Sequence, residues 1–171
     1  MGILYHGTDV DNAISIARKV VILSPLEQHL EKLVKIYIEK PEIESYWKGS
    51  TLGQFALNSL KSSYGPHEIE HRVKCVSVTK DLSQASSYAQ RYEERDGGLV
   101  LGIELDDKYI KRMTKGKDVA YIPKLLSIHT LRELHLSKIA KEKCEQLIKK
   151  EFHEYNPKYF DIQWNTTMQH Q

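Results

Sequence analysis

The sequence predicts an α+β fold, with helices concentrated early in the chain and most strands late. Apolar residues recur at helical spacing between Val10 and Ile38, and short runs rich in valine, isoleucine and leucine, typical of buried strands, follow in the second half. The chain has 171 residues, of which 40% are hydrophobic and 28% charged, so it can bury one core. We therefore expect a single domain over 1–171, with its core at about 3–136 and a C-terminal helix and tail at 137–171.

The first half of the chain is expected to alternate short strands with helices. A strand at Ile3–Tyr5 precedes a helix, because apolar residues follow it at helical spacing and because Thr8 or Asp9 can act as the N-cap. The most regular helical pattern begins at Pro25, and Pro41 ends it. The other elements expected in this half are a strand at 20–23, a helix at 52–60 and a loop at 62–66.

The second half is expected to hold most of the sheet. Leu99–Leu105 has the strongest strand pattern, and Asp96–Gly98 before it is typical of a turn. Further strands are predicted at 73–78, 119–122 and 131–136. Two helices are predicted, one with Ala85, Tyr88, Ala89 and Tyr92 on one face, and one capped by Ser137 with Ala140, Cys144, Leu147 and Ile148 on its buried side. The tail after Asn156 is expected to pack on the body through Tyr159, Phe160, Ile162 and Trp164.

Composition and charge point to a soluble protein of the cytoplasm. The formal net charge is +2, which is too small to indicate a nucleic-acid partner by itself. Cys75 and Cys144 are the only cysteines, which favours a reducing compartment over a disulfide framework. The chain opens without the basic and apolar regions of a signal peptide, and no apolar run approaches the ~20 residues that span a bilayer. We expect no membrane partner.

Four segments in sequence order carry a resemblance to a known family. They are Tyr5-His6-Gly7-Thr8, Ser77–Ala89, Gly98–Leu105 and Asp118–Pro123. Together they resemble the His-type ADP-ribosyltransferases, which include the poly(ADP-ribose) polymerases. The resemblance implies split antiparallel sheets with helices, NAD as the substrate, no metal, and a protein or nucleic acid as the macromolecular acceptor.

The resemblance also implies roles for individual residues. His6 would hydrogen-bond the adenosine ribose, and the backbone of Gly7 would grip the nicotinamide carboxamide, since only a residue without Cβ allows that approach. Tyr88 would stack on the nicotinamide ring. The implied cofactor-binding residues are Tyr5, His6, Gly7, Thr8, Ser77, Thr79 and Tyr88, and the implied catalytic residues are His6, Tyr88 and Asp118.

Three departures from the family pattern narrow the expected activity. Ala85 stands where polymerase-type members have a serine, and Ser77 where they have a second tyrosine. The family's catalytic glutamate falls on Asp118, one methylene shorter, so that Glu133 and Glu104 are alternative acids. These departures favour mono-ADP-ribosyl transfer or a non-catalytic domain that binds NAD or ADP-ribose.

Two further hypotheses are weighed against this one. RNA 2′-phosphotransferases share the architecture and also open with His-Gly-Thr, and Arg72 and Arg95 would be their phosphate-binding residues. His67-Glu68-Ile69-Glu70-His71 matches the H-E-x-x-H signature of zinc proteases, but the preceding Gly-Pro and the following strand argue against the helix which that chemistry needs. The sequence does not distinguish a toxin, a defence factor, an effector and a housekeeping enzyme.

Overall fold

The computed structural model describes residues 2–39, 54, 56, 58, 75–92, 94–108, 119–123 and 125–163. The chain divides into two compact units. The first comprises Met1–Val21, Val78–Ala120 and Ser127–Gln171, and the second comprises Ile22–Ser77 and Tyr121–Leu126. The predicted α+β class is confirmed, whereas the single domain stays a prediction.

The strands form one large sheet and one small sheet. They are β1 (Gly2–Asp9), β2 (Val21–Leu23), β3 (Cys75–Thr79), β4 (Gly98–Leu105), β5 (Val119–Pro123), β6 (Leu125–Ser127), β7 (Leu131–Leu136) and β8 (Lys158–Asp161). The strand order is β5-β3-β1-β4-β7-β8 in the large sheet and β2-β6 in the small one. β1 is antiparallel to β4 along its whole length, from Gly2↔Leu105 to Asp9↔Gly98. β4 is antiparallel to β7.

The last strand makes the sheet mixed, which corrects the expectation of purely antiparallel sheets. β8 pairs with β7 in parallel, and the pairs run from Glu133↔Lys158 to Leu136↔Asp161. A parallel pair needs a crossover connection, and helix α7 (Lys138–Glu151) is that connection. The tail after Asn156 therefore joins the sheet. Of the side chains expected to pack on the body, Ile162 is buried, whereas Tyr159 and Phe160 are exposed.

The helices form where the sequence predicts them, and their caps are local. They are α1 (Val10–Lys19), α2 (Pro25–Glu39), α5 (Leu82–Gln90) and α7. Asp9 caps α1 by accepting a hydrogen bond from the Asn12 amide at 2.7 Å, and Ser137 caps α7 through the Ala140 amide at 3.2 Å. Each cap satisfies a backbone donor that the first turn of a helix leaves unpaired.

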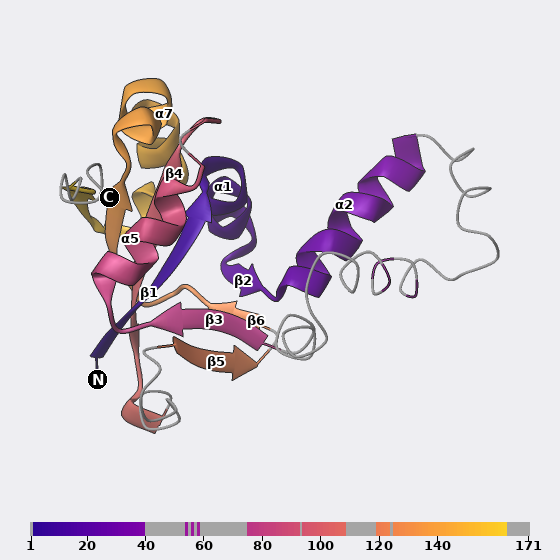
Figure 1. Cartoon of the computed structure of the whole chain (residues 1–171), viewed down its shortest axis with the longest axis horizontal. Helices are drawn as coiled ribbons and strands as arrows, with labels where there is room; N and C mark the ends of the chain where they lie inside the picture. Colours follow the sequence, from indigo (N-terminus) through magenta and orange to yellow (C-terminus); the bar gives the residue numbers. More distant parts are fainter. Residues whose placement is uncertain are drawn as a thin grey trace, which may run out of the picture. The chain divides into compact units, whose positions relative to one another are not determined.

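The two faces of the large sheet differ in the first unit. Helix α5 contacts the sheet at Gly7 and Gly98. Because side chains alternate along a strand, the neighbours of these two glycines point to the face opposite α5. That other face is apolar, and its members are nearly fully buried: Leu4, Leu99, Leu101, Ile103, Leu134 and Leu136. α1 contacts both β1 and β4, while α5 lies alongside the same two strands (Figure 1). The core therefore lies mostly between the sheet and helices α1 and α7.

In the second unit, helix α2 comes directly after strand β2 in the chain. Its first turn is held by Ser24, whose carbonyl accepts from the Gln28 amide at 3.0 Å. The Gln28 side chain donates to the Leu23 carbonyl at 2.9 Å. The predicted helix is confirmed, but its apolar stripe is only partly buried, since Ile38 is 71% exposed.

Several predicted details are corrected, and others fall on residues without a described structure. Leu147 is exposed rather than buried on α7, and Tyr92 lies just beyond the end of α5. Only Gln54, Ala56 and Asn58 of the predicted helix at 52–60 are described, and they are helical. The loop at 62–66 and Trp164 lie outside the described residues. In the part of the chain that is described, no helix combines the length and the apolar character that crossing a membrane requires.

Candidate functional site

The Tyr5-His6-Gly7-Thr8 motif lies inside strand β1 rather than at its end. β1 runs from Gly2 to Asp9, so the motif's side chains alternate between the two faces of the sheet. Tyr5 and Gly7 lie on the face that α5 covers, and His6 and Thr8 on the apolar face. Thr8 is buried there, and His6 is half-buried. The structure thus divides the four residues into two pairs.

Gly7 has a structural reason to be glycine, because helix α5 packs directly on it. A Cβ atom at Gly7 would lie 2.5 Å from the backbone oxygen of Ala85. The same packing recurs one strand away, where a Cβ at Gly98 would overlap the backbone oxygen of Ala89. The two glycines and the two alanines let the helix backbone approach the sheet closely. Gly7 nevertheless stays partly exposed.

The edge of β1 that faces away from β4 pairs with β3. The antiparallel register between the two strands includes Tyr5↔Thr79. Val78 and Thr79 of β3 belong to the first unit together with β1, whereas the earlier residues of β3 belong to the second.

Thr79 lies at the turn that leads into α5, and Tyr88 lies within that helix. The Thr79 hydroxyl accepts a hydrogen bond from the Asp81 amide and donates to Gln84 Oε1, each at 3.0 Å. Tyr88 is half-buried. The Arg91 guanidinium carbon lies 5.1 Å from the centre of its ring, a cation–π geometry that occupies one ring face. Thr79 therefore organises the turn into the helix, and stacking by Tyr88 stays a prediction.

Glu133, one of the two alternative acids, meets Tyr5 across strand β4. Gly102 of β4 pairs with Tyr5 on one side and with Glu133 on the other. A Cβ at Gly102 would lie 2.9 Å from the Glu133 Cβ and 3.2 Å from the Tyr5 ring, so only glycine leaves this space. The Tyr5 hydroxyl donates to Glu133 Oε2 at 3.4 Å. The Glu133 side chain remains 20% exposed, so a ligand can reach it.

His135 extends this contact, and it was not among the site residues predicted from the sequence. Its Nε2 lies 2.9 Å from Glu133 Oε2, the oxygen that also accepts from Tyr5. The His135 side chain is only 7% exposed. Its ring stacks on Phe160 of β8, with ring centres 4.8 Å apart and planes at 18°. The available signal was the two-residue spacing from Glu133, which puts both side chains on one face of a strand.

The network changes the acidity of Tyr5. Burial raises the pKa of the Tyr5 phenol above its ordinary value of 10.0, and the negative charge of Glu133 and the hydrogen bond to it raise the pKa further. Tyr5 is therefore a neutral donor at physiological pH. Its role in the network is to hold the carboxylate rather than to transfer a proton.

Glu104, the other alternative acid, is engaged differently. Its Oε2 accepts a hydrogen bond from Arg132 Nε at 2.7 Å. This ion pair joins β4 to β7 near the point where the register between these strands shifts. A carboxylate neutralised by a guanidinium gives less stabilisation to a second positive charge. Of the two alternatives, Glu133 has the geometry better suited to a positively charged transition state.

The remaining site predictions fall in the second unit or outside the described residues. Ser77 belongs to the second unit and is half-buried. Asp118, Arg72 and the whole of His67–His71 lie outside the described residues. Among the residues that are described, no three histidine, cysteine or acidic side chains gather as a metal site would require.

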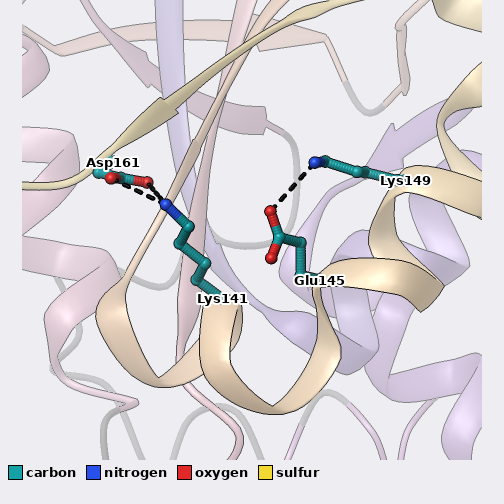
Figure 2. A network of polar contacts seen from close by, with 4 residues as sticks. All are labelled: Lys141, Glu145, Lys149 and Asp161. Atoms are coloured by element: carbon teal, nitrogen blue, oxygen red, sulfur yellow. Dashed lines mark hydrogen bonds and ion pairs between the residues drawn. The ribbon is translucent and has the colours of Figure 1, made fainter.

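A separate hollow of about 490 Å³ lies between α7 and β8. Figure 2 shows its charged walls, in which Lys141 bonds both carboxylate oxygens of Asp161 and Lys149 reaches Glu145. The distances are 2.9 and 3.0 Å for the first pair and 3.0 Å for the second. Each of these cations already has an internal counter-ion, so the hollow offers an anionic ligand little net charge.

No family model matches the chain, and no curated protein matches it significantly. The ADP-ribosyltransferase hypothesis thus depends on the motifs and on the geometry around Tyr5 and Glu133.

Proposed function

We propose that the protein is an NAD-dependent mono-ADP-ribosyltransferase in which Glu133 provides the catalytic carboxylate. One observation carries the proposal: the motif tyrosine Tyr5 and the acid Glu133 meet on one face of the sheet, although 128 positions separate them in the chain. The proposal includes the specific fold type, an ADP-ribosyltransferase-type split sheet.

The chemistry required is loss of nicotinamide from the ribose of NAD. The C–N glycosidic bond breaks, nicotinamide leaves with the bonding electrons, and the ribose develops oxocarbenium-like positive charge. A carboxylate beside the ribose hydroxyls stabilises that charge, and one preorganised group of this kind contributes about 3–4 kcal/mol. The acceptor then bonds to the ribose carbon and loses its proton. Glu133 provides the partly exposed carboxylate that this step needs.

Gly7 supports the placement of the nicotinamide end. The backbone of Gly7 is the proposed carboxamide grip, because this residue stays partly exposed and has no Cβ to keep a ligand away from its amide and carbonyl. Neighbouring strands lie about 4.8 Å apart, so the Glu133 backbone is roughly 10 Å from β1 and its side chain bridges part of that distance. Tyr88 keeps its proposed role at the nicotinamide ring. The role of His6 at the adenosine ribose stays a prediction, because its side chain lies on the face of the sheet opposite to Glu133.

Labelled NAD tests the proposal directly. The protein is incubated with NAD labelled in its adenylate phosphate and with cell lysate, and the product is then digested separately with nuclease and with protease. We expect a labelled macromolecule, whose loss in one of the digests identifies the acceptor class. Glu133→Gln is expected to lower kcat by about 100- to 1,000-fold with an unchanged fold.

Matched amide variants identify the acid. Glu104→Gln and Asp118→Asn remove a carboxylate in the same way as Glu133→Gln, and we expect both to retain transfer. Full activity of Glu133→Gln together with an inactive Asp118→Asn would assign the catalytic carboxylate to Asp118. Tight NAD binding without any labelled product in the wild type would favour the non-catalytic alternative. Release of phosphate from 2′-phosphorylated RNA would instead favour the phosphotransferase.

A further inference from the structure

We propose that His135 is a positioning residue that fixes the orientation of the Glu133 carboxylate, a role that rests on the proposed function. Glu133 and His135 are two residues apart on β7, so both side chains lie on the same face of the sheet. The histidine Nε2 lies 2.9 Å from Oε2, and a ring nitrogen next to a carboxylate is the N–H donor of the pair.

Both donors of the network converge on the same oxygen. Tyr5 and His135 each bond Oε2, and Oε1 makes no hydrogen bond with the part of the chain that the structure describes. Two donors on one oxygen fix the carboxylate plane and leave the second oxygen to accept a substrate hydroxyl. A carboxylate on a freely rotating side chain would spend only part of its time in that orientation.

The imidazole is itself held from two directions. Phe160 stacks on one ring face with planes at 18°, and the Tyr5 ring meets His135 edge-on at 5.9 Å and 80°. Phe160 is placed there by the pairing His135↔Phe160 between β7 and β8. The parallel strand at the end of the sheet thus supports the proposed acid through one intermediate residue. Contacts on the ring face and the ring edge restrict the rotamers of His135, as a positioning role requires.

Two substitutions at His135 distinguish positioning from packing. His135→Gln keeps an N–H donor within reach of Glu133, whereas His135→Leu keeps the apolar contact with Phe160 and removes the donor. We expect His135→Leu to lower kcat about 10- to 100-fold, the usual loss when a partner that orients a reactive group is removed, while KM for NAD changes less than about twofold. His135→Gln should recover most of kcat. Thermal unfolding of both variants reports their folding.

The outcomes separate this role from the proposed function. An active wild type in which the Gln and Leu variants lose kcat equally, or in which KM carries the loss, overturns the positioning role alone. A wild type that neither transfers ADP-ribose nor releases nicotinamide overturns the proposed function and this role with it.

A spectroscopic measurement checks the bond without activity. Long-range proton–nitrogen NMR of the imidazole should show Nε2 protonated in the wild type, with a resonance that moves in Glu133→Gln. An Nε2 that carries no proton would contradict the assigned donor and overturn the proposal.

Discussion

The two faces of the large sheet both bury apolar side chains, but they hold their helices differently. On one face, leucines and isoleucines of β1, β4 and β7 are almost wholly buried. On the other, Gly7 and Gly98 let the backbone of α5 approach the strands, and polar groups at Tyr5, Glu133 and His135 occupy the space beside it. The first face is held by apolar burial alone. The second combines a smaller apolar cluster around Val100, Ala85 and Ala89 with room for a partly exposed carboxylate.

The largest effect on stability is expected from the apolar face. Leu101, on the central strand β4, is fully buried, so Leu101→Ala removes apolar contacts and leaves a cavity. We expect a loss of about 2–5 kcal/mol in the free energy of unfolding, measured by urea titration. Glu133→Gln, on the other face, is the matched comparison and should leave stability close to that of the wild type. Equal destabilisation by the two variants would break the distinction between the faces.

A smaller loss is expected where α5 touches the sheet. Gly7→Ala places a methyl group 2.5 Å from the backbone oxygen of Ala85, so the helix must shift. Overpacking of this kind costs about 1–3 kcal/mol in unfolding free energy. Ala85→Gly should not rescue the variant, because the clash is with a backbone atom. A Gly7→Ala protein of wild-type stability would show that α5 is not seated on β1 as described.

The smallest effect is expected from the Tyr5 hydroxyl. Its bond to Glu133 is long, at 3.4 Å, so Tyr5→Phe should cost less than about 1 kcal/mol in unfolding free energy at neutral pH. Because folding raises the pKa of Tyr5, the folded state favours the protonated phenol. This contribution is complete below pH 10.0, the ordinary phenol value, and falls as pH rises above it.

The difference in unfolding free energy between the wild type and Tyr5→Phe should therefore shrink in alkaline solution. Urea titrations at neutral pH and above pH 10 measure it. A difference that grows with pH would contradict the assigned hydrogen bond.

Local sequence patterns predicted most of the elements correctly. Ser137 was identified as a cap, and Asp9 as one of two candidates with Thr8, because capping depends on a few neighbouring residues. Leu99–Leu105 was identified as a strand because a continuous apolar run between turns fits little else. β8 was missed as a strand because its four residues are all exposed and it forms only through the crossover by α7. Leu147 was assigned to the wrong side because helical spacing gives a face but not its partner.

The candidate site likewise combines residues that local patterns predicted with contacts that they did not predict. The motif at Tyr5 and Gly7 was visible in the sequence, and Glu133 appeared there only as an alternative to Asp118. Gly102 within a strong strand was an available signal, since a glycine inside a strand often marks a close approach. The meeting of Tyr5 with Glu133 was not predictable, because it depends on which strands lie on either side of β4.

The sequence by itself determined the α+β class, the places where helices α1, α2 and α7 begin, and the motif on β1, because periodicity, caps and turn residues act over a few positions. Tertiary structure alone decided that Glu133 and His135 lie beside Tyr5, and Phe160 beside His135. That proximity results from strand order and register, which join residues more than a hundred positions apart. Strand pairing of this range is fixed by how the whole core packs, so no local pattern encodes it.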